Sequence, residues 1–140
     1  ALSTEANDDF GCPHTLEHLI FMGSEKYPFK GYLDILANRS FADGTNAWTA
    51  TDHTAYTLTT AGSEGFLNVC PIFVDHILAP TLSDEAFLTE VHHVDGDGEN
   101  AGVVYCEMQG RENTGESLAW NKLLHMVYGE PNECGLSSET

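Results

Sequence analysis

The chain has 140 residues, which is enough for one domain with a hydrophobic core. It carries 22 Asp and Glu residues against 5 Lys and Arg residues, so its formal net charge is −17. This charge argues against nucleic acid and membrane surfaces as partners and is compatible with basic peptides, and no apolar run is long enough to span a bilayer.

The first half of the chain predicts two helices and three strands. Apolar residues at helical spacing follow Pro13, which favours the first turn of a helix, and Gly23 stands where that helix should end. Further on, β-branched and aromatic residues alternate with polar ones, which predicts a pair of strands. In chain order, the expected elements are the end of a strand, two helices and two paired strands, over residues 1–4, 13–22, 29–38, 46–51 and 53–61.

The second half predicts four more helices and one strand. Ser63 is expected to cap a long amphipathic helix, and Pro71 in its middle is expected to kink or split that helix. Ser83 is expected to cap a short helix. In chain order, these elements are two helices, a strand and two helices, over residues 63–78, 83–88, 89–94, 101–109 and 117–127. This succession predicts a layered α+β fold.

Residues 14–18 have the sequence His-Thr-Leu-Glu-His and lie inside the first predicted helix. Positions i and i+4 share a helix face, so the imidazoles of His14 and His18 can reach one cation. Zinc held by two histidines and a carboxylate, with a position left for water, forms a catalytic site and not a structural one. Glu17 is then placed to deprotonate the water, and the order His-x-x-Glu-His is that of the inverzincins.

The alternative explanation of this motif is a helix with two surface histidines and one surface glutamate. The apolar residues Leu16, Leu19 and Ile20 argue against it, because histidines among them would be partly buried. Buried polar groups need partners, and a metal ion is a natural one.

Four blocks of residues, in order along the chain, carry a resemblance to a known family. They comprise residues 11–19, 21–24 and 26–28 around the motif, and then residues 45–52, 91–96 and 102–110. Together they resemble the insulinase/pitrilysin zinc metallopeptidases, and within that family the presequence-protease branch and its cytosolic relatives. The resemblance implies a two-layer α/β sandwich, in which helices cover one face of a mixed or antiparallel sheet.

The resemblance also implies a distal zinc ligand, a glutamate on a later helix, and Glu107 is the residue at the matching position. The residues alone support this choice modestly, because Glu107 shares a predicted helix face with Val103 and Val104. Spacing by itself leaves other glutamates open as the third ligand, namely Glu90, Glu99, Glu112 and Glu116. Glu99 is expected either to orient a ligand or to be a solvated loop carboxylate.

By resemblance, the chain is a zinc endopeptidase domain that cleaves unfolded peptides. One zinc ion is bound by His14, His18 and Glu107, and Glu17 acts as a general base and then as a general acid. The peptide is expected to add to an edge strand through backbone hydrogen bonds, with contacts from Asn46 and Ala47. For Asn46, a role in a turn or at the end of a strand is an equally good explanation.

Members of this family enclose the peptide between two homologous halves. The chain is therefore expected to be one truncated catalytic domain, residues 1–140, whose partners are the remaining domains of a longer polypeptide. Four widely spaced cysteines suit a reducing compartment, so a cytoplasmic location is expected, with the mitochondrial matrix as the alternative. Cys12 and Cys106, near the expected ligands, are expected to be buried free thiols.

Two other functions stay open. One is a catalytically inactive family member that acts as a structural or partner subunit, although the complete motif argues against it. The other is an unrelated acidic binding module with a fortuitous motif, which predicts no stoichiometric zinc.

Overall fold

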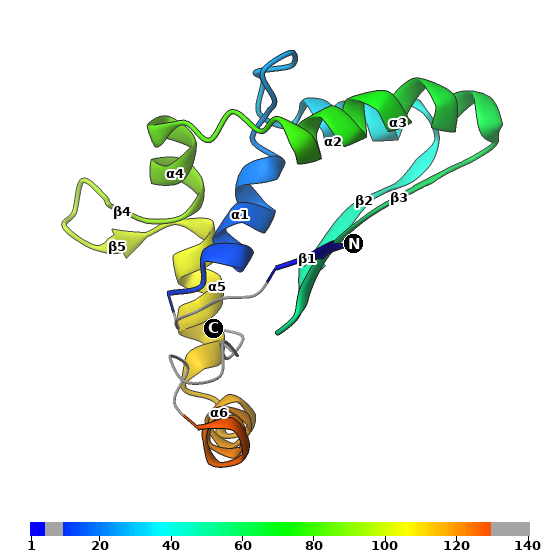
Figure 1. The fold of residues 1–140 in the computed structure, drawn as a ribbon. Helices are drawn as coiled ribbons and strands as arrows, with labels where there is room; N and C mark the ends of the chain where they lie inside the picture. The colour runs from blue at the N-terminus through cyan, green and yellow to red at the C-terminus, as the bar shows by residue number, and fades with distance from the viewer. Residues whose placement is uncertain (5–9, 130–140) are drawn as a thin grey trace.

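The computed structural model describes residues 1–4 and 10–129, and Figure 1 shows how their helices and strands are arranged. Three antiparallel strands form a sheet in the spatial order β1 (Leu2–Ser3), β3 (His53–Thr60) and β2 (Ala42–Thr49). A second, two-stranded sheet is the hairpin of β4 (His93–Val94) and β5 (Asn100–Ala101). The helices are α1 (Cys12–Ile20), α2 (Tyr32–Arg39), α3 (Ser63–Leu78), α4 (Asp84–Glu90), α5 (Val103–Glu112) and α6 (Gly115–Tyr128).

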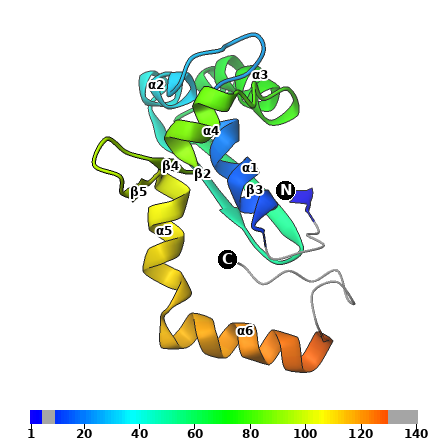
Figure 2. The same ribbon diagram turned by 90° about the vertical axis from the view of Figure 1, so that its left-hand side faces the viewer.

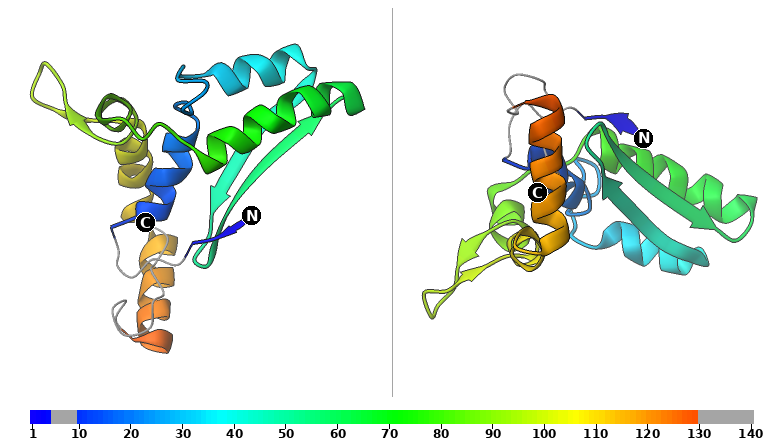
Figure 3. Two further views of the ribbon diagram at one scale, coloured as in Figure 1. Left: turned by 45° about the horizontal axis from the view of Figure 1, so that its top comes forward. Right: turned by 90° about the horizontal axis from the view of Figure 1, so that it is seen from below.

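Within the described residues, helices cover one face of the three-stranded sheet. The register of β2 and β3 places Ala47 opposite Tyr56 and Thr49 opposite Thr54, and opposite residues point to the same face. Tyr56 packs against the core of α2 and α3, which lie side by side along this face in Figure 3. Asn46 alternates with these positions and is exposed. The α+β class and the one-sided cover of helices predicted from the sequence are therefore confirmed.

Helix α1 lies between the pair α4 and α5 on one side and the pair α2 and α3 on the other (Figure 1), and a hydrophobic cluster lies on each side. On one side, Leu19 packs against Ala86 of α4, Val91 just after α4, and Val104 of α5. On the other side, Phe21 packs against the buried residues of α2 and α3, namely Leu33, Val69 and Phe73. The position of α1 is thus fixed from both sides.

Helix α5 descends from the β4–β5 hairpin, and α6 turns away from it in Figure 2. None of the residues of α6 is buried. No helix in the described part of the chain combines the length and the apolar character that crossing a membrane requires.

The structure shows that Pro71 does not split helix α3 and that Ser63 does not cap it. It runs from Ser63 to Leu78 without interruption, although Pro71 lies inside it. The carbonyl that Pro71 leaves without an N–H partner belongs to Leu67, and both residues are exposed, so water can hydrate that carbonyl. The N-cap is Gly62 and no side chain caps the helix, so the prediction that Ser63 is the cap was wrong.

The strand predicted over residues 89–94 was mostly wrong. Helix α4 continues to Glu90, and the strand is limited to His93–Val94. The Ser83 side chain caps α4 as predicted, because its Oγ accepts a hydrogen bond from the backbone N–H of Ala86 at 3.2 Å. Burial of Ala86 and Val91 against α1 keeps this segment helical in spite of its β-branched residues.

Candidate metal centre

Helix α1 carries both histidines of the motif on one face. The helix begins after Gly11, whose φ of 69° lies in the left-handed region, and Pro13 occupies its first turn. One turn apart, the rings of His14 and His18 have centroids 4.9 Å apart and lie nearly at right angles to each other. The two imidazoles are largely buried, so water competes only partly for their nitrogens.

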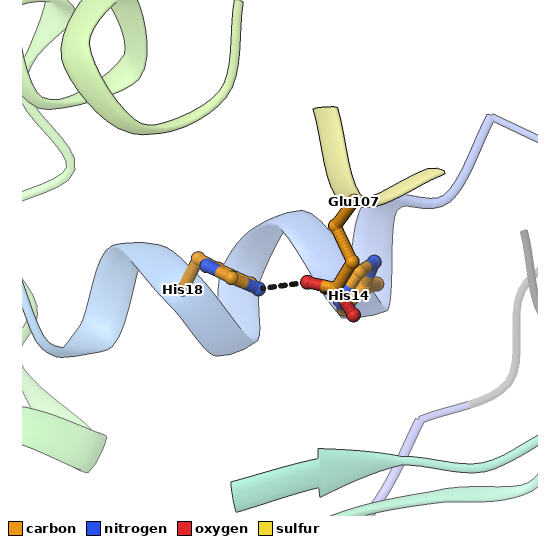
Figure 4. Close-up of side chains that lie close together, drawn as sticks. All are labelled: His14, His18 and Glu107. Carbon is orange, nitrogen blue, oxygen red and sulfur yellow. Dashed lines mark ion pairs between the residues drawn. The ribbon is translucent and has the colours of Figure 1, made fainter. Parts of the chain in front are cut away.

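Helix α5 brings Glu107 to this pair, as Figure 4 shows. Its Oε2 lies 3.5 Å from His18 Nε2 and 3.8 Å from His14 Nε2. One potential ligand atom from each of the three residues lies within 4.8 Å of the other two. The structure therefore brings together the three residues that were expected to bind zinc.

The position of α5 depends on a glycine that no other residue could replace without strain. Gly102 precedes α5 with a φ of +124°, and a Cβ built there would lie 2.3 Å from the carbonyl oxygen of Val91. The close approach lets the backbone N–H of Tyr105 donate a hydrogen bond to that carbonyl at 3.1 Å. Because Val91 also packs against Leu19 of α1, this contact fixes α5, and with it Glu107, relative to the histidines.

The electrostatics of the cluster favour a neutral His14. Burial lowers the pKa of His14 and the neighbouring His18 lowers it further, whereas Glu107 and Glu17 act in the opposite direction. A lowered pKa leaves a lone pair on the imidazole near neutral pH, which metal binding requires. Arg111 Nη1 lies 3.5 Å from Oε1 of Glu107, so one oxygen of this carboxylate faces Arg111 and the other faces the imidazoles.

Glu17 lies between the two histidines in sequence but contacts the sheet. Thr49 of β2 donates a hydrogen bond from Oγ1 to Glu17 Oε2 at 2.6 Å. Burial raises the pKa of Tyr56 on β3 to about 12, and the nearby charge of Glu17 adds to the shift. Glu17 is therefore held beside the histidines without belonging to the cluster that they form with Glu107.

A cavity of about 310 Å³ connects this glutamate with the expected substrate residues. Glu17 and His18 line it from α1, and Asn46 and Ala47 line it from β2. In the described part of the sheet, β2 is an edge strand with only β3 as a neighbour. The structure thus brings Asn46 and Ala47 to the same cavity as the catalytic base expected from the sequence.

Glu99 does not join this cluster in the structure. It is exposed, and its backbone N–H and carbonyl form hydrogen bonds with Asp95 in the β4–β5 turn. Glu90 instead has its Oε1 3.2 Å from Nδ1 of His18. In α4, Glu90 follows the buried Ala86 by four residues and shares its helix face, a relation that the strand predicted over residues 89–94 concealed.

The cysteines near the cluster are exposed. Cys12 and Cys106 are free and exposed, so the expectation that they are buried was wrong. Cys12 lies two residues before His14, and Cys106 lies one residue before Glu107. A helix turns such neighbouring side chains in different directions, so each cysteine can be exposed while the ligand next to it faces the cluster. Neither cysteine belongs to the group of potential ligands, and Cys134 lies outside the described residues.

Comparison with known families and proteins gives a consistent match. The model of the family described as Insulinase (Peptidase family M16) matches residues 3–107. An uncharacterized protein of Caenorhabditis elegans is 61% identical over 125 residues, which cover 89% of this chain and 13% of that protein. The mitochondrial presequence protease of Candida albicans is 32% identical over 143 residues, which cover 96% of this chain and 14% of that protein.

A solved structure matches the fold. The crystal structure of pitrilysin superposes with a TM-score of 0.55 at 20% sequence identity, over 99% of this chain and 14% of the pitrilysin chain. The chain therefore spans only about one seventh of the length of these proteins.

Proposed function

We propose a zinc-dependent peptidase function for this chain, which belongs to the insulinase family of peptidases, family M16. The observation that carries the proposal is the convergence of three ligand atoms, Nε2 of His14, Nε2 of His18 and Oε2 of Glu107. Two imidazoles and one carboxylate are a donor set of catalytic zinc sites, which leave a fourth position open.

The distances from Glu107 to the two histidines come close to the spacing that this metal requires. Tetrahedral zinc with bonds of about 2.0–2.2 Å separates its ligand atoms by about 3.3–3.6 Å. Glu107 Oε2 is already 3.5 Å from one imidazole nitrogen and 3.8 Å from the other. The three ligand atoms lie within 4.8 Å of one another, so they would have to draw closer around the ion, and His14, His18 and Glu107 are the residues that would hold zinc.

When bound, zinc supplies Lewis acidity, which polarises a carbonyl oxygen and makes water acidic enough to attack near neutral pH. Glu17 takes the proton of the attacking water on its carboxylate and later gives it to the nitrogen of the leaving amine. The hydrogen bond from Thr49 holds one oxygen of this carboxylate, which leaves the other oxygen for the proton. Orientation of this kind lowers the entropic cost of reaching the transition state.

The proposed substrate is an unfolded peptide in an extended conformation. The edge strand β2 offers backbone groups to which such a peptide can add as a further strand. Its residues Asn46 and Ala47 line the cavity that Glu17 and His18 also line, so a peptide on this edge would pass beside the base. The negative charge of the chain favours basic peptides.

A cytoplasmic location is part of the proposal, with the mitochondrial matrix as the alternative. The described cysteines are free, and two of them are exposed, which supports a reducing compartment. The alternative comes from the relatives that are named mitochondrial presequence proteases. Imaging of the tagged protein in cells distinguishes the two compartments.

The decisive experiment measures zinc content and peptide cleavage together, in the intact protein. The wild type should contain one zinc ion and cleave unfolded peptides. Glu17→Gln should keep the zinc and lose about two to four orders of magnitude in turnover, because proton transfer by a positioned group contributes that much. His18→Ala should lose both zinc and activity, and Glu116→Gln, on α6, should lose neither.

The outcomes separate the alternatives. Wild-type protein without stoichiometric zinc would contradict the proposal and favour an acidic binding module. Zinc without peptide cleavage would favour an inactive family member that serves as a partner subunit. Near wild-type turnover in Glu17→Gln would remove Glu17 from the mechanism.

A further inference from the structure

Glu90 contacts His18, a proposed zinc ligand, at the ring nitrogen that does not face Glu107. It is the last residue of α4, and its Oε1 lies 3.2 Å from Nδ1 of His18. Both side chains are largely buried, with 14% of Glu90 and 17% of His18 exposed. Both residues also line the cavity beside Asn46 and Ala47. The contact joins residues that are 72 positions apart in the sequence.

The chemistry of the pair determines which nitrogen of His18 carries the proton. An ionised carboxylate only accepts hydrogen bonds, so the Nδ1 of His18 must donate to Glu90. In a neutral imidazole, the lone pair then lies on Nε2. Nε2 is the atom that lies 3.5 Å from Glu107, on the side where His14 also points its Nε2.

We propose that Glu90 is a positioning residue that holds His18 in the tautomer and orientation needed for metal binding. This inference rests on the proposed zinc site. Glu90 is not itself a ligand of the same ion, because Glu90 and Glu107 contact opposite nitrogens of one ring. A carboxylate behind a ligating histidine also makes the imidazole a stronger base, which strengthens its bond to a metal.

Lys30 completes the arrangement from the loop before α2. Its Nζ lies 3.4 Å from Oε2 of Glu90, the carboxylate oxygen that does not face His18. The lysine is 63% exposed, so its ion pair with Glu90 is partly screened and contributes less than the contact with His18. Lys30 therefore restrains Glu90 and offsets part of its negative charge.

Two readouts test the proposal in the intact protein. The first is the tautomer of His18 in the metal-free protein, read from the ¹⁵N chemical shifts of its ring nitrogens at a pH where the ring is neutral. The wild type should show a proton on Nδ1, and Glu90→Ala should lose this preference. The second is zinc affinity, measured by competition with a chelator. Glu90→Ala should weaken it by about 10- to 100-fold, as expected for loss of such a partner.

Matched variants separate positioning from general damage to the fold. Glu90→Gln keeps a carbonyl oxygen that can accept the hydrogen bond, so it should retain the Nδ1–H tautomer and lose less affinity than Glu90→Ala. Lys30→Met should lose less still. Asp84→Ala, an exposed residue at the other end of α4, should leave both readouts unchanged.

The two levels of the proposal can fail separately. If the wild type binds zinc tightly and Glu90→Ala keeps both the tautomer and the affinity, the role of Glu90 is refuted and the zinc site stands. If Glu90→Gln loses as much as Glu90→Ala, charge rather than the hydrogen bond acts on His18, which also overturns the proposal. If the wild type binds no zinc, the proposed function fails and the inference about metal binding fails with it.

Discussion

Replacement of Gly102 by alanine would test how firmly the fold holds Glu107 beside the histidines. An added Cβ would lie 2.3 Å from the carbonyl oxygen of Val91 and 2.9 Å from the Cα of His92, both of which belong to backbone that cannot rotate away. The φ of +124° is in addition a value that other residues avoid. Gly102→Ala must therefore move the start of α5 and the glutamate that α5 carries.

The expected cost follows from these two causes. A residue held in a region that only glycine occupies easily costs about 1–3 kcal/mol, and overpacking at a tight contact costs about another 1–3 kcal/mol. Gly102→Ala should thus lower the free energy of unfolding by about 2–6 kcal/mol, out of about 5–15 kcal/mol for a typical domain. Zinc affinity should fall as well, because Glu107 is displaced.

Gly110 provides a control in the same helix. A Cβ at Gly110 would meet no atom within 4 Å, and its φ is helical. Gly110→Ala should therefore stabilise the protein by about 0.5–1 kcal/mol. Urea denaturation and chelator competition on the wild type and the two variants measure both quantities. Unchanged stability and zinc affinity in Gly102→Ala would refute the reasoning, as would an equal loss in both variants.

Three further predictions concern single groups. Thr49→Val should lower kcat roughly tenfold or more at unchanged zinc content, because a hydrogen bond to a charged group such as Glu17 contributes about 1.5–3 kcal/mol. Peptide cleavage by this variant decides it, with Thr59→Val on the exposed face of β3 as the control. The raised pKa of Tyr56 means that its contribution to stability is present below about pH 10 and is lost as the pH rises toward about 12. Tyr56→Phe should flatten that alkaline loss in thermal denaturation. A hydrogen bond from Ser24 and, to a smaller extent, one from Lys26 hold the pKa of Asp75 below its ordinary value of 3.8. The contribution of Asp75 to stability is therefore present above pH 3.8 and is lost as the pH falls through the lowered pKa. Asp75→Asn should therefore have a shallower acid limb in the same measurement, and an unchanged limb would contradict the assignment.

The parts of the site that the sequence predicts are those that one helix determines. His14, Glu17 and His18 could be placed because Pro13 and the apolar spacing define α1 from neighbouring residues alone, although the helix ends at Ile20 and not next to Gly23 as predicted. The strand pair that carries Asn46 and Ala47 was also recognisable, since alternation defines its two faces. The proximity of Glu107 to α1 depended on the family resemblance, because spacing along the chain does not determine which helices meet.

The sequence analysis left Glu90 open as a third ligand but missed its contact with His18, because of an error in secondary structure. The β-branched residues Thr89 and Val91 predicted a strand, in which Glu90 and His92 would share one face. Burial against Leu19 outweighs this local preference and extends α4 by two residues. Only in the helical register does the side chain of Glu90 lie on the face of α4 that is turned toward α1.

The contacts around α1 join residues that are far apart along the chain, and this has a consequence for folding. Glu17 meets Thr49 across 32 residues and His18 meets Glu90 across 72 residues. Such contacts require large loops to close, so they form late and slowly in comparison with the helices themselves. Zinc added to the unfolded chain would therefore find an incomplete set of ligands. It should slow unfolding of the finished domain more than it accelerates refolding.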